Sequence, residues 1–151
     1  MDRAFPPTGF HFRVEFVNVE EATEKDVKFR EVSGLSAELG IEEVTEGGEN
    51  RFTHRLPSRG KYSNLVLKRG LLTDSGLIKW IWDAIESFKF QPSDVNVTLL
   101  NEQHEPVAET YSFNGAWPQK WSISDFNAQD NSIVVESLEL VYKYFTRTAL
   151  D

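Results

Sequence analysis

The charged residues between positions 41 and 70 are sorted by sign. Residues 41–50 contain four acids and no base, and residues 51–70 contain six bases and no acid. Exposed ion pairs within one chain are worth only about 0–1 kcal/mol each, whereas complementary patches on two surfaces set the register of a contact and reject wrong partners. The pattern therefore favours a surface that meets another copy of the chain head to tail. The acids are Glu42, Glu43, Glu46 and Glu49, and the bases are Arg51, Arg55, Arg59, Lys61, Lys68 and Arg69.

The other residues with chemical potential form no recognisable active site. His11, His54 and His104 lack the spacing of metal ligands, and the chain has no cysteine. Ser124 lies outside any G-x-S-x-G nucleophile elbow. The pair at positions 47–48 lacks the G-K-[S/T] of a phosphate loop and lies among acids. We therefore expect no catalytic residue, no cofactor and no metal.

Part of the chain after position 124 loosely resembles a calcium-binding loop. Asp125, Asn127 and Gln129 alternate, and Glu136 stands at the twelfth position. The sixth position is Asp130, where the sharp turn of such a loop needs glycine. A polar turn is the better interpretation of this segment.

The basic run could instead bind nucleic acid, because Phe52 and Tyr62 lie among its bases. The formal net charge of the chain is −8, and an acidic run comes directly before the bases. Affinity for nucleic acid comes from neutralising phosphates. The charge balance therefore favours a protein–protein surface over nucleic-acid recognition.

Length and composition predict one folded domain. The chain has 151 residues, of which 40% are hydrophobic and 13% aromatic, enough for a sizeable core. The N-terminal residues show no secretory signal, and no apolar run approaches the roughly 20 residues of a membrane span. We therefore expect a protein that is made and folded in a cytoplasm.

Hydrophobic periodicity predicts a mainly β fold, an antiparallel barrel or sandwich of about six to seven strands with one flanking helix. A turn is expected at residues 57–60 and a loop-rich connection at 115–131. The expected strands are 10–17, 27–32, 35–44, 62–69, 95–99, 106–114 and 133–145, and residues 52–56 form a further candidate extended segment.

One segment has helical spacing, and the last strand has two apolar faces. The helix is expected over about residues 74–88, capped by Thr73 or Asp74 and stopped before Pro92. Its apolar stripe is Leu77, Trp80, Ile81, Ala84, Ile85 and Phe88. Apolar residues on both faces of the strand at 133–145 predict burial on both faces or contact with a partner.

Short motifs run along the whole chain in a characteristic order. They are residues 12–16, 31–35, 46–50, 56–57, 61–70, Trp80, 117–121 and 135–140. Together they resemble the tail tube protein family of T-even-like phages and contractile injection systems. The resemblance implies a β-barrel-like fold with a flanking helix, forming one tail-tube domain over residues 1–151. It further implies hexameric rings that stack into a hollow tube inside a contractile sheath and deliver protein or DNA cargo, with baseplate and tube-cap proteins as further partners.

A ring-and-stack protein needs contacts that close around the ring and repeat along its axis. We expect residues 45–62 to contact a neighbouring subunit or ring, and adjacent subunits to join their sheets so that strand edges are paired. The surplus acid would line the lumen and repel an acidic cargo. The predicted contact residues are the ten charged residues of the sorted segment together with Asn50 and Tyr62.

Two alternatives remain at this stage. The first is a specialised tube-initiating or baseplate-proximal ring protein of the same fold. The second is a freestanding β-barrel that binds a small ligand, which needs an apolar cavity and has no use for charge-sorted loops. A third hypothesis, a hydrolase on a β-sandwich, has no support because the sequence contains no catalytic constellation.

Overall fold

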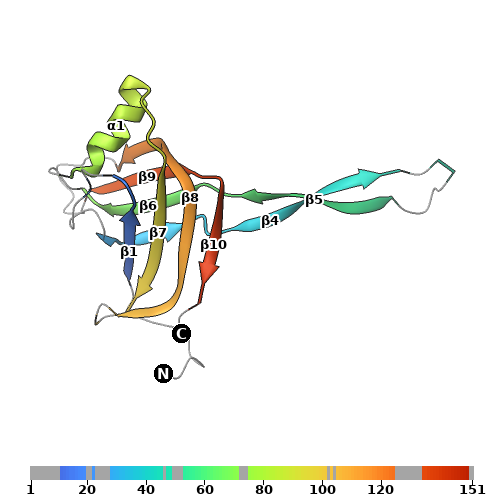
Figure 1. Ribbon diagram of the computed structural model, residues 1–151, viewed down its shortest axis with the longest axis horizontal. Helices are drawn as coiled ribbons and strands as arrows, with labels where there is room; N and C mark the ends of the chain where they lie inside the picture. Colours follow the sequence, from blue (N-terminus) through green and yellow to red (C-terminus); the bar gives the residue numbers. More distant parts are fainter. Residues whose placement is uncertain are drawn as a thin grey trace.

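A computed structural model describes residues 11–19, 22, 28–45, 47–48, 53–71, 75–101, 103, 105–124 and 134–149. These residues form a curled β body, a helix beside it, and a long hairpin that projects away from it (Figure 1). The strands are β1 (His11–Phe16), β2 (Lys28–Phe29), β3 (Glu31–Ser33), β4 (Ala37–Val44), β5 (His54–Tyr62), β6 (Leu65–Gly70), β7 (Ser93–Leu100), β8 (Pro106–Ile123), β9 (Val135–Val141) and β10 (Tyr144–Thr148), and the helix is α1 (Leu77–Ser87).

The body is one antiparallel sheet that curls until its ends meet. The strand order is β2-β1-β7-β8-β9-β6-β3, with β10 added on β8. The two end strands are separated in sequence only by Arg30, whose N–H donates to the carbonyl of Lys68 at 2.8 Å. This arrangement confirms the predicted mainly β, barrel-like fold with one flanking helix.

Strand β8 is longer than the sequence predicts and joins the two halves of the body. Its first part pairs with β7 and β10, and its second part pairs with β9. The predicted loop at 115–131 is therefore wrong for residues 115–123, while 125–131 lie outside the described residues. Gly115 has a φ of +65°, and Pro118 lies where the pairing with β9 shifts register. Both residues look like loop signals but occupy irregular positions within a strand.

The predicted final strand at 133–145 is two strands. The chain leaves β9 after Val141 and enters β10 at Tyr144, and the N–H of Lys143 donates to the carbonyl of Asn114 at 2.9 Å. Tyr142 is buried, whereas Tyr144 is exposed and Phe145 packs against the core. The apolar face thus changes side at the break, which accounts for Phe145 on the second apolar face of the sequence pattern, whereas Val135 and Val141 are half-buried on the other side of β9.

The core lies inside the curled sheet and under the helix. Its side chains fill the interior, so the freestanding ligand-binding barrel gains no support from the fold. The core includes Val14, Leu65, Leu67, Val95, Val97, Phe113, Leu138 and Leu140 from strands and Leu77, Trp80, Ile81 and Ala84 from α1.

The helix confirms the predicted element but is shorter at both ends. Gly76 precedes it without a side-chain cap, and residues 73 and 74 lie outside the described residues. Phe88 adopts a left-handed conformation with φ of 53° and ends the helix well before Pro92. Ile85 and Phe88, the last two residues of the expected apolar stripe, are 43% and 81% exposed, so the structure does not bury the end of the stripe. No described helix combines the length and apolar character needed to cross a membrane.

Candidate assembly surface

Strands β4 and β5 form a separate two-stranded sheet, here called the arm, which extends away from the body (Figure 1). Within Ala37–Val44 and His54–Tyr62, Gly40 alone is buried and nearly every other residue is exposed. An isolated two-stranded hairpin is at best marginally stable in water. The arm is therefore the part of the chain that most needs a surface to pack against.

The register of the arm places its acidic strand beside its basic strand. Glu38 lies opposite Lys61, and Glu43 lies opposite Arg55. Directly opposed charges of unlike sign contribute roughly 0.2–1 kcal/mol to strand pairing. Part of the charge sorting seen in the sequence therefore pairs acids with bases across two strands of one chain. The sequence alone did not predict this pairing.

The arm also exposes apolar side chains on one face. Ala37, Leu39 and Ile41 alternate along β4 and so share a face, and Pro57 lies opposite Ile41 on β5. Leu39 is 68% exposed and Ile41 57% exposed. The sequence predicted this period-two row as a strand face, but the single chain leaves it uncovered. A contiguous exposed apolar patch marks a protein contact.

Two glycines and a proline shape the middle of the arm. A Cβ on Gly40 would lie 2.3 Å from the Ser58 hydroxyl oxygen and 3.2 Å from the Arg59 carbonyl oxygen, so any larger residue requires Ser58 to move. The strand register shifts between Leu39, which lies opposite Gly60, and Ile41, which lies opposite Pro57. Residues 57–60, predicted as a turn, therefore lie within β5 at a bulge.

The structure divides the predicted contact residues into three groups. Glu42, Glu43, Arg55, Arg59 and Lys61 are exposed on the arm. Tyr62 lies at the base of the arm, where its ring contacts those of Tyr142 and Phe145 at centroid distances of 5.9 and 5.5 Å. Lys68 and Arg69 form the second group and lie in the body. Glu46, Glu49, Asn50 and Arg51 form the third group and lie outside the described residues.

Arg69 does not belong to a contact surface, because the body buries it. Its side chain is 4% exposed, and its Nε donates to Glu136, itself 3% exposed, at 2.9 Å. A second Arg69 nitrogen donates to the Ser75 hydroxyl at 2.9 Å, and the Trp121 indole N–H donates to Glu136 at 2.7 Å. The guanidinium also lies 5.0 Å from the Phe29 ring centre. The prediction for Arg69 is therefore wrong.

Lys68, the next predicted contact residue, is half-buried in β6. Its register partners are Glu31 on β3 and Ser137 on β9.

The sequence did contain a signal for the buried pair of Arg69 and Glu136. Glu136 occupies the same side of its strand as the buried Leu138 and Leu140, and a lone acid in an apolar row indicates a buried partner.

Strand β10 forms an edge of the body. Among the described residues it pairs with β8 alone. Arg147 Nε donates to Glu109 at 2.7 Å across this pair, and the hydrogen bond lowers the pKa of the Glu109 carboxyl. Burial raises the pKa of Tyr111 on β8. A groove beside the edge is lined by Leu35, Ala37, Tyr62, Tyr111, Phe145 and Arg147.

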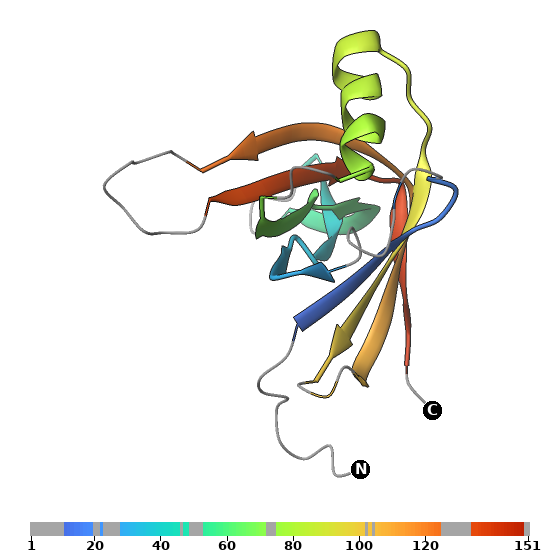
Figure 2. The ribbon, with the colours of Figure 1, turned by 90° about the vertical axis from the view of Figure 1, so that its left-hand side faces the viewer.

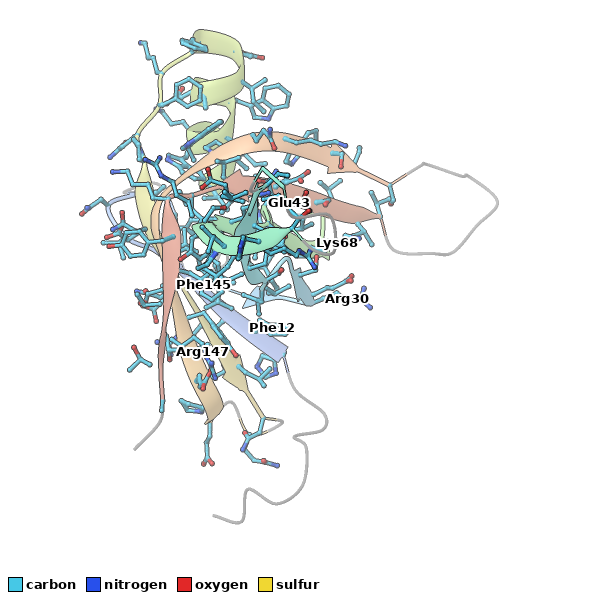
Figure 3. The ribbon with its side chains drawn as sticks, turned by 90° about the vertical axis from the view of Figure 1, so that its right-hand side faces the viewer. Phe12, Arg30, Glu43, Lys68, Phe145 and Arg147 are labelled. Carbon is cyan, nitrogen blue, oxygen red and sulfur yellow. The ribbon has the colours of Figure 1, made fainter. Side chains whose placement is uncertain are left out.

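The groove lies at the base of the arm, because Ala37 and Tyr62 of the arm line it. Figure 3 shows Phe145 and Arg147 along β10 and Glu43 on the arm. The Tyr142 hydroxyl donates to the carbonyl of Ser63 at 2.7 Å, which ties the base of the arm to the body. Burial raises the pKa of Tyr142 to about 12. The site thus combines an exposed arm with an open strand edge, a pair of features suited to self-assembly.

Solved structures place this fold among proteins of contractile tail-like particles. A chain of the anti-feeding prophage (AFP) baseplate matches with a TM-score of 0.78 and 29% identity over 97% of both chains. A chain of the PVC extracellular contractile injection system sheath–tube complex in the extended state has a TM-score of 0.78 and 22% identity, covering 98% of this chain and 95% of that one. Hcp1 from Flavobacterium johnsoniae has a TM-score of 0.52 and 11% identity, covering 93% of this chain and 98% of that one.

A match to a protein-family model identifies the family of this chain. Residues 8–146 match the family described as T4-like virus tail tube protein gp19. The protein therefore belongs to this tail tube family and is a structural subunit of a phage tail or tail-like particle. The resemblance stated from the sequence motifs is confirmed. A comparison with curated proteins found no match.

Proposed function

We propose that this protein forms hexameric rings that stack into a hollow tube, and that the arm makes the contacts between subunits. The observation that carries the proposal is the exposure of both apolar and charged residues on the arm. Leu39 and Ile41 are more than half exposed, although they alternate as core residues do. A heterologous contact with a second copy would cover this row and pair the exposed charges.

The strand order supports closure into a ring. Strands β1, β7, β8 and β10 lie side by side and alternate in direction. The first and last strands of this unit are antiparallel, so β1 of a second copy could continue the alternation beside β10. Strand β2 covers only Phe12 and Arg13 of β1, which leaves part of that edge open among the described residues.

Such a ring has a plausible size. Six copies of a four-stranded unit give about 24 strands, which at roughly 4.8 Å each enclose a circle about 37 Å across between backbones before any strand tilt. A closed ring of strands also removes the exposed edges that would otherwise cause aggregation. Hexamers are the state that the motif resemblance implies.

The role we propose is mechanical rather than catalytic. The tube lies inside a contractile sheath, ends at baseplate and cap proteins, and holds cargo in its lumen. The protein acts as a single domain that is assembled in the bacterial cytoplasm. The membership of the tail tube family supports these partners.

The test reverses two arm charges. Arg55→Glu combined with Arg59→Glu should abolish tubes in negative-stain micrographs while lowering the free energy of unfolding of the subunit by no more than about 1 kcal/mol, because both side chains are exposed. A matched control reverses two exposed bases of the body, Lys89→Glu and Lys120→Glu, and should assemble. Normal tubes from the arm variant would contradict the proposed role of the arm.

A further inference from the structure

The four-stranded unit β1-β7-β8-β10 has a polar face on the side opposite the core. Side chains that lie directly opposite one another across the four strands share a face. Two complete rows cross the sheet on this side, and they contain one acid and one base. The rows are Arg13–Thr98–Thr110–Thr148 and Glu15–Asn96–Ser112–Thr146.

The two charges in these rows cancel locally. Arg13 Nε donates to a Glu15 carboxylate oxygen at 2.9 Å. The remaining six side chains are hydroxyls and amides, and the Thr98 and Thr110 hydroxyl oxygens lie 3.3 Å apart. The whole chain carries a formal charge of −8. The two rows therefore carry no net charge, unlike the average surface of this protein. Asp94, the next residue on this side of β7, accepts the N–H of Gly115 at 3.0 Å.

The fold decides which way this face points in a ring. The core face of the four-stranded unit is covered by the other body strands and α1, which lie to one side of it (Figure 2). If strand edges close the ring as proposed above, one face of the unit lines the channel and the other faces outward. The covered face carries the bulk of each subunit, which cannot fit inside a channel about 37 Å across. The polar rows must then face the channel.

We propose that these rows, five hydroxyls and one amide beside one internally paired acid and base, form a wall without net charge that lets polypeptide cargo of either net charge pass without retention. This inference rests on the proposed ring. Nucleic acid is held by cations that displace its counterions, and the only cation in the rows is paired with Glu15. A charged wall would hold the oppositely charged patches of a protein. Hydrogen bonds to hydroxyls and amides only replace those to water and hold cargo weakly.

The inference replaces one of our sequence-based expectations. The surplus of acid predicted an acid-lined lumen, which would keep DNA or an acidic cargo from sticking to the wall. The one acid of the rows, Glu15, is paired with Arg13, and several described acids lie elsewhere, for example Glu38, Glu42 and Glu43 on the arm. A neutral wall therefore discriminates by size rather than by charge.

The test adds charge to the wall of tubes formed by the full chain. Thr146 and Thr148 are exposed on β10 within the two rows. The Lys variant carries Thr146→Lys and Thr148→Lys, the Glu variant carries Thr146→Glu and Thr148→Glu, and the neutral control carries Thr146→Ser and Thr148→Ser. Asn96→Lys and Asn96→Glu on β7 repeat the test at a central position. Each protein is assembled with three fluorescent probes: an acidic and a basic version of one small folded protein, and a single-stranded DNA oligonucleotide.

Retention after sedimentation of the tubes is the measurement. Wild-type and neutral-control tubes should retain the two protein versions equally within about twofold and should not retain the oligonucleotide. Lys walls should retain the acidic protein and the oligonucleotide at least about tenfold more at low salt, and Glu walls the basic protein, with both effects lost at high salt.

Three results would overturn the inference. Wild-type tubes could retain one protein version or the oligonucleotide several-fold more than the other probes, which would reveal a charged wall. Tubes of the Lys and Glu variants could retain all probes as the wild type does, which would place these rows outside the channel. A wild-type protein that forms neither rings nor tubes in micrographs would overturn the proposed function as well, and this separates the two failures.

Discussion

Residues of the same type differ in burial between the arm and the barrel body. Leu67 in the body is fully buried, whereas Ile41 on the arm is 57% exposed. Arg69 in the body is buried against Glu136, whereas Arg55 on the arm is exposed opposite Glu43. The body satisfies its side chains within one chain and the arm does not. The stability of the subunit should therefore reside in the body, and the arm should matter chiefly to assembly.

The largest contrast is expected from breaking the buried ion pair. Glu136→Ala removes the partner of a buried guanidinium and should lower the free energy of unfolding by about 3–5 kcal/mol. Glu43→Ala removes an exposed arm acid and should change it by less than about 0.5 kcal/mol. Urea unfolding followed by tryptophan fluorescence measures both values. Equal losses for the two variants would refute the division between body and arm.

The next contrast removes equivalent apolar volume from each region. Leu67→Ala leaves a cavity in the core and should cost about 2–5 kcal/mol. Ile41→Ala removes an exposed side chain and should cost less than about 0.5 kcal/mol, yet it should weaken tube formation because it thins the uncovered apolar row. Urea unfolding and micrographs of assembled protein separate these readouts. An arm variant that loses stability but still assembles would reverse our interpretation.

Much of the body could be predicted from local periodicity, because its strands bury one face. Val14 and Phe16 alternate with polar residues, and Leu77, Trp80 and Ile81 mark the buried face of the helix. The family could also be predicted, because its motifs run along the whole chain in order. These patterns are local, and burial within the same chain enforces them.

The remaining features depend on contacts between distant residues. Arg69 and Glu136 are 67 residues apart, so neither pattern alone placed the arginine inside the body. The bulge at residues 57–60 lies where the register with the facing strand shifts between Leu39 and Ile41, and the isolated sequence looks like a turn. The break between β9 and β10 follows from two different parts of β8, because β9 pairs with its second part and β10 with its first part. Hydrophobic periodicity identifies the face of a strand or helix that is buried, but it does not identify the element that covers this face.

A smaller effect is expected where the arm joins the body. Tyr142→Phe removes the hydrogen bond to the Ser63 carbonyl and should cost about 0.5–1.5 kcal/mol at neutral pH. The pKa of Tyr142 is raised by burial from about 10 to about 12. The buried neutral phenol therefore contributes its full stability below pH 10, and this contribution is lost as the pH rises toward 12.

Unfolding of the wild type and the Phe variant should be compared at pH 8 and at successive values from about 10 to 12, because other ionising groups are common to both proteins. The difference in unfolding free energy between the two should shrink across this window. A difference that stays constant would mean that Tyr142 ionises equally readily in the folded and unfolded states. The pH-dependent part of the stability would then belong to other groups of the body.

The smallest change in subunit stability is expected from exchanging two charges across the arm. Glu43→Arg with Arg55→Glu preserves the opposed pair, whereas Arg55→Glu alone places two acids opposite one another and should cost only about 0.2–1 kcal/mol. If the charges served the arm alone, the exchange would restore tubes that the single reversal loses. Because we propose that they also face a second copy, the exchange should restore the unfolding free energy without restoring tubes in micrographs. Tubes from the exchanged variant would mean that the sorted charges of residues 41–70 stabilise the arm and do not select its partner.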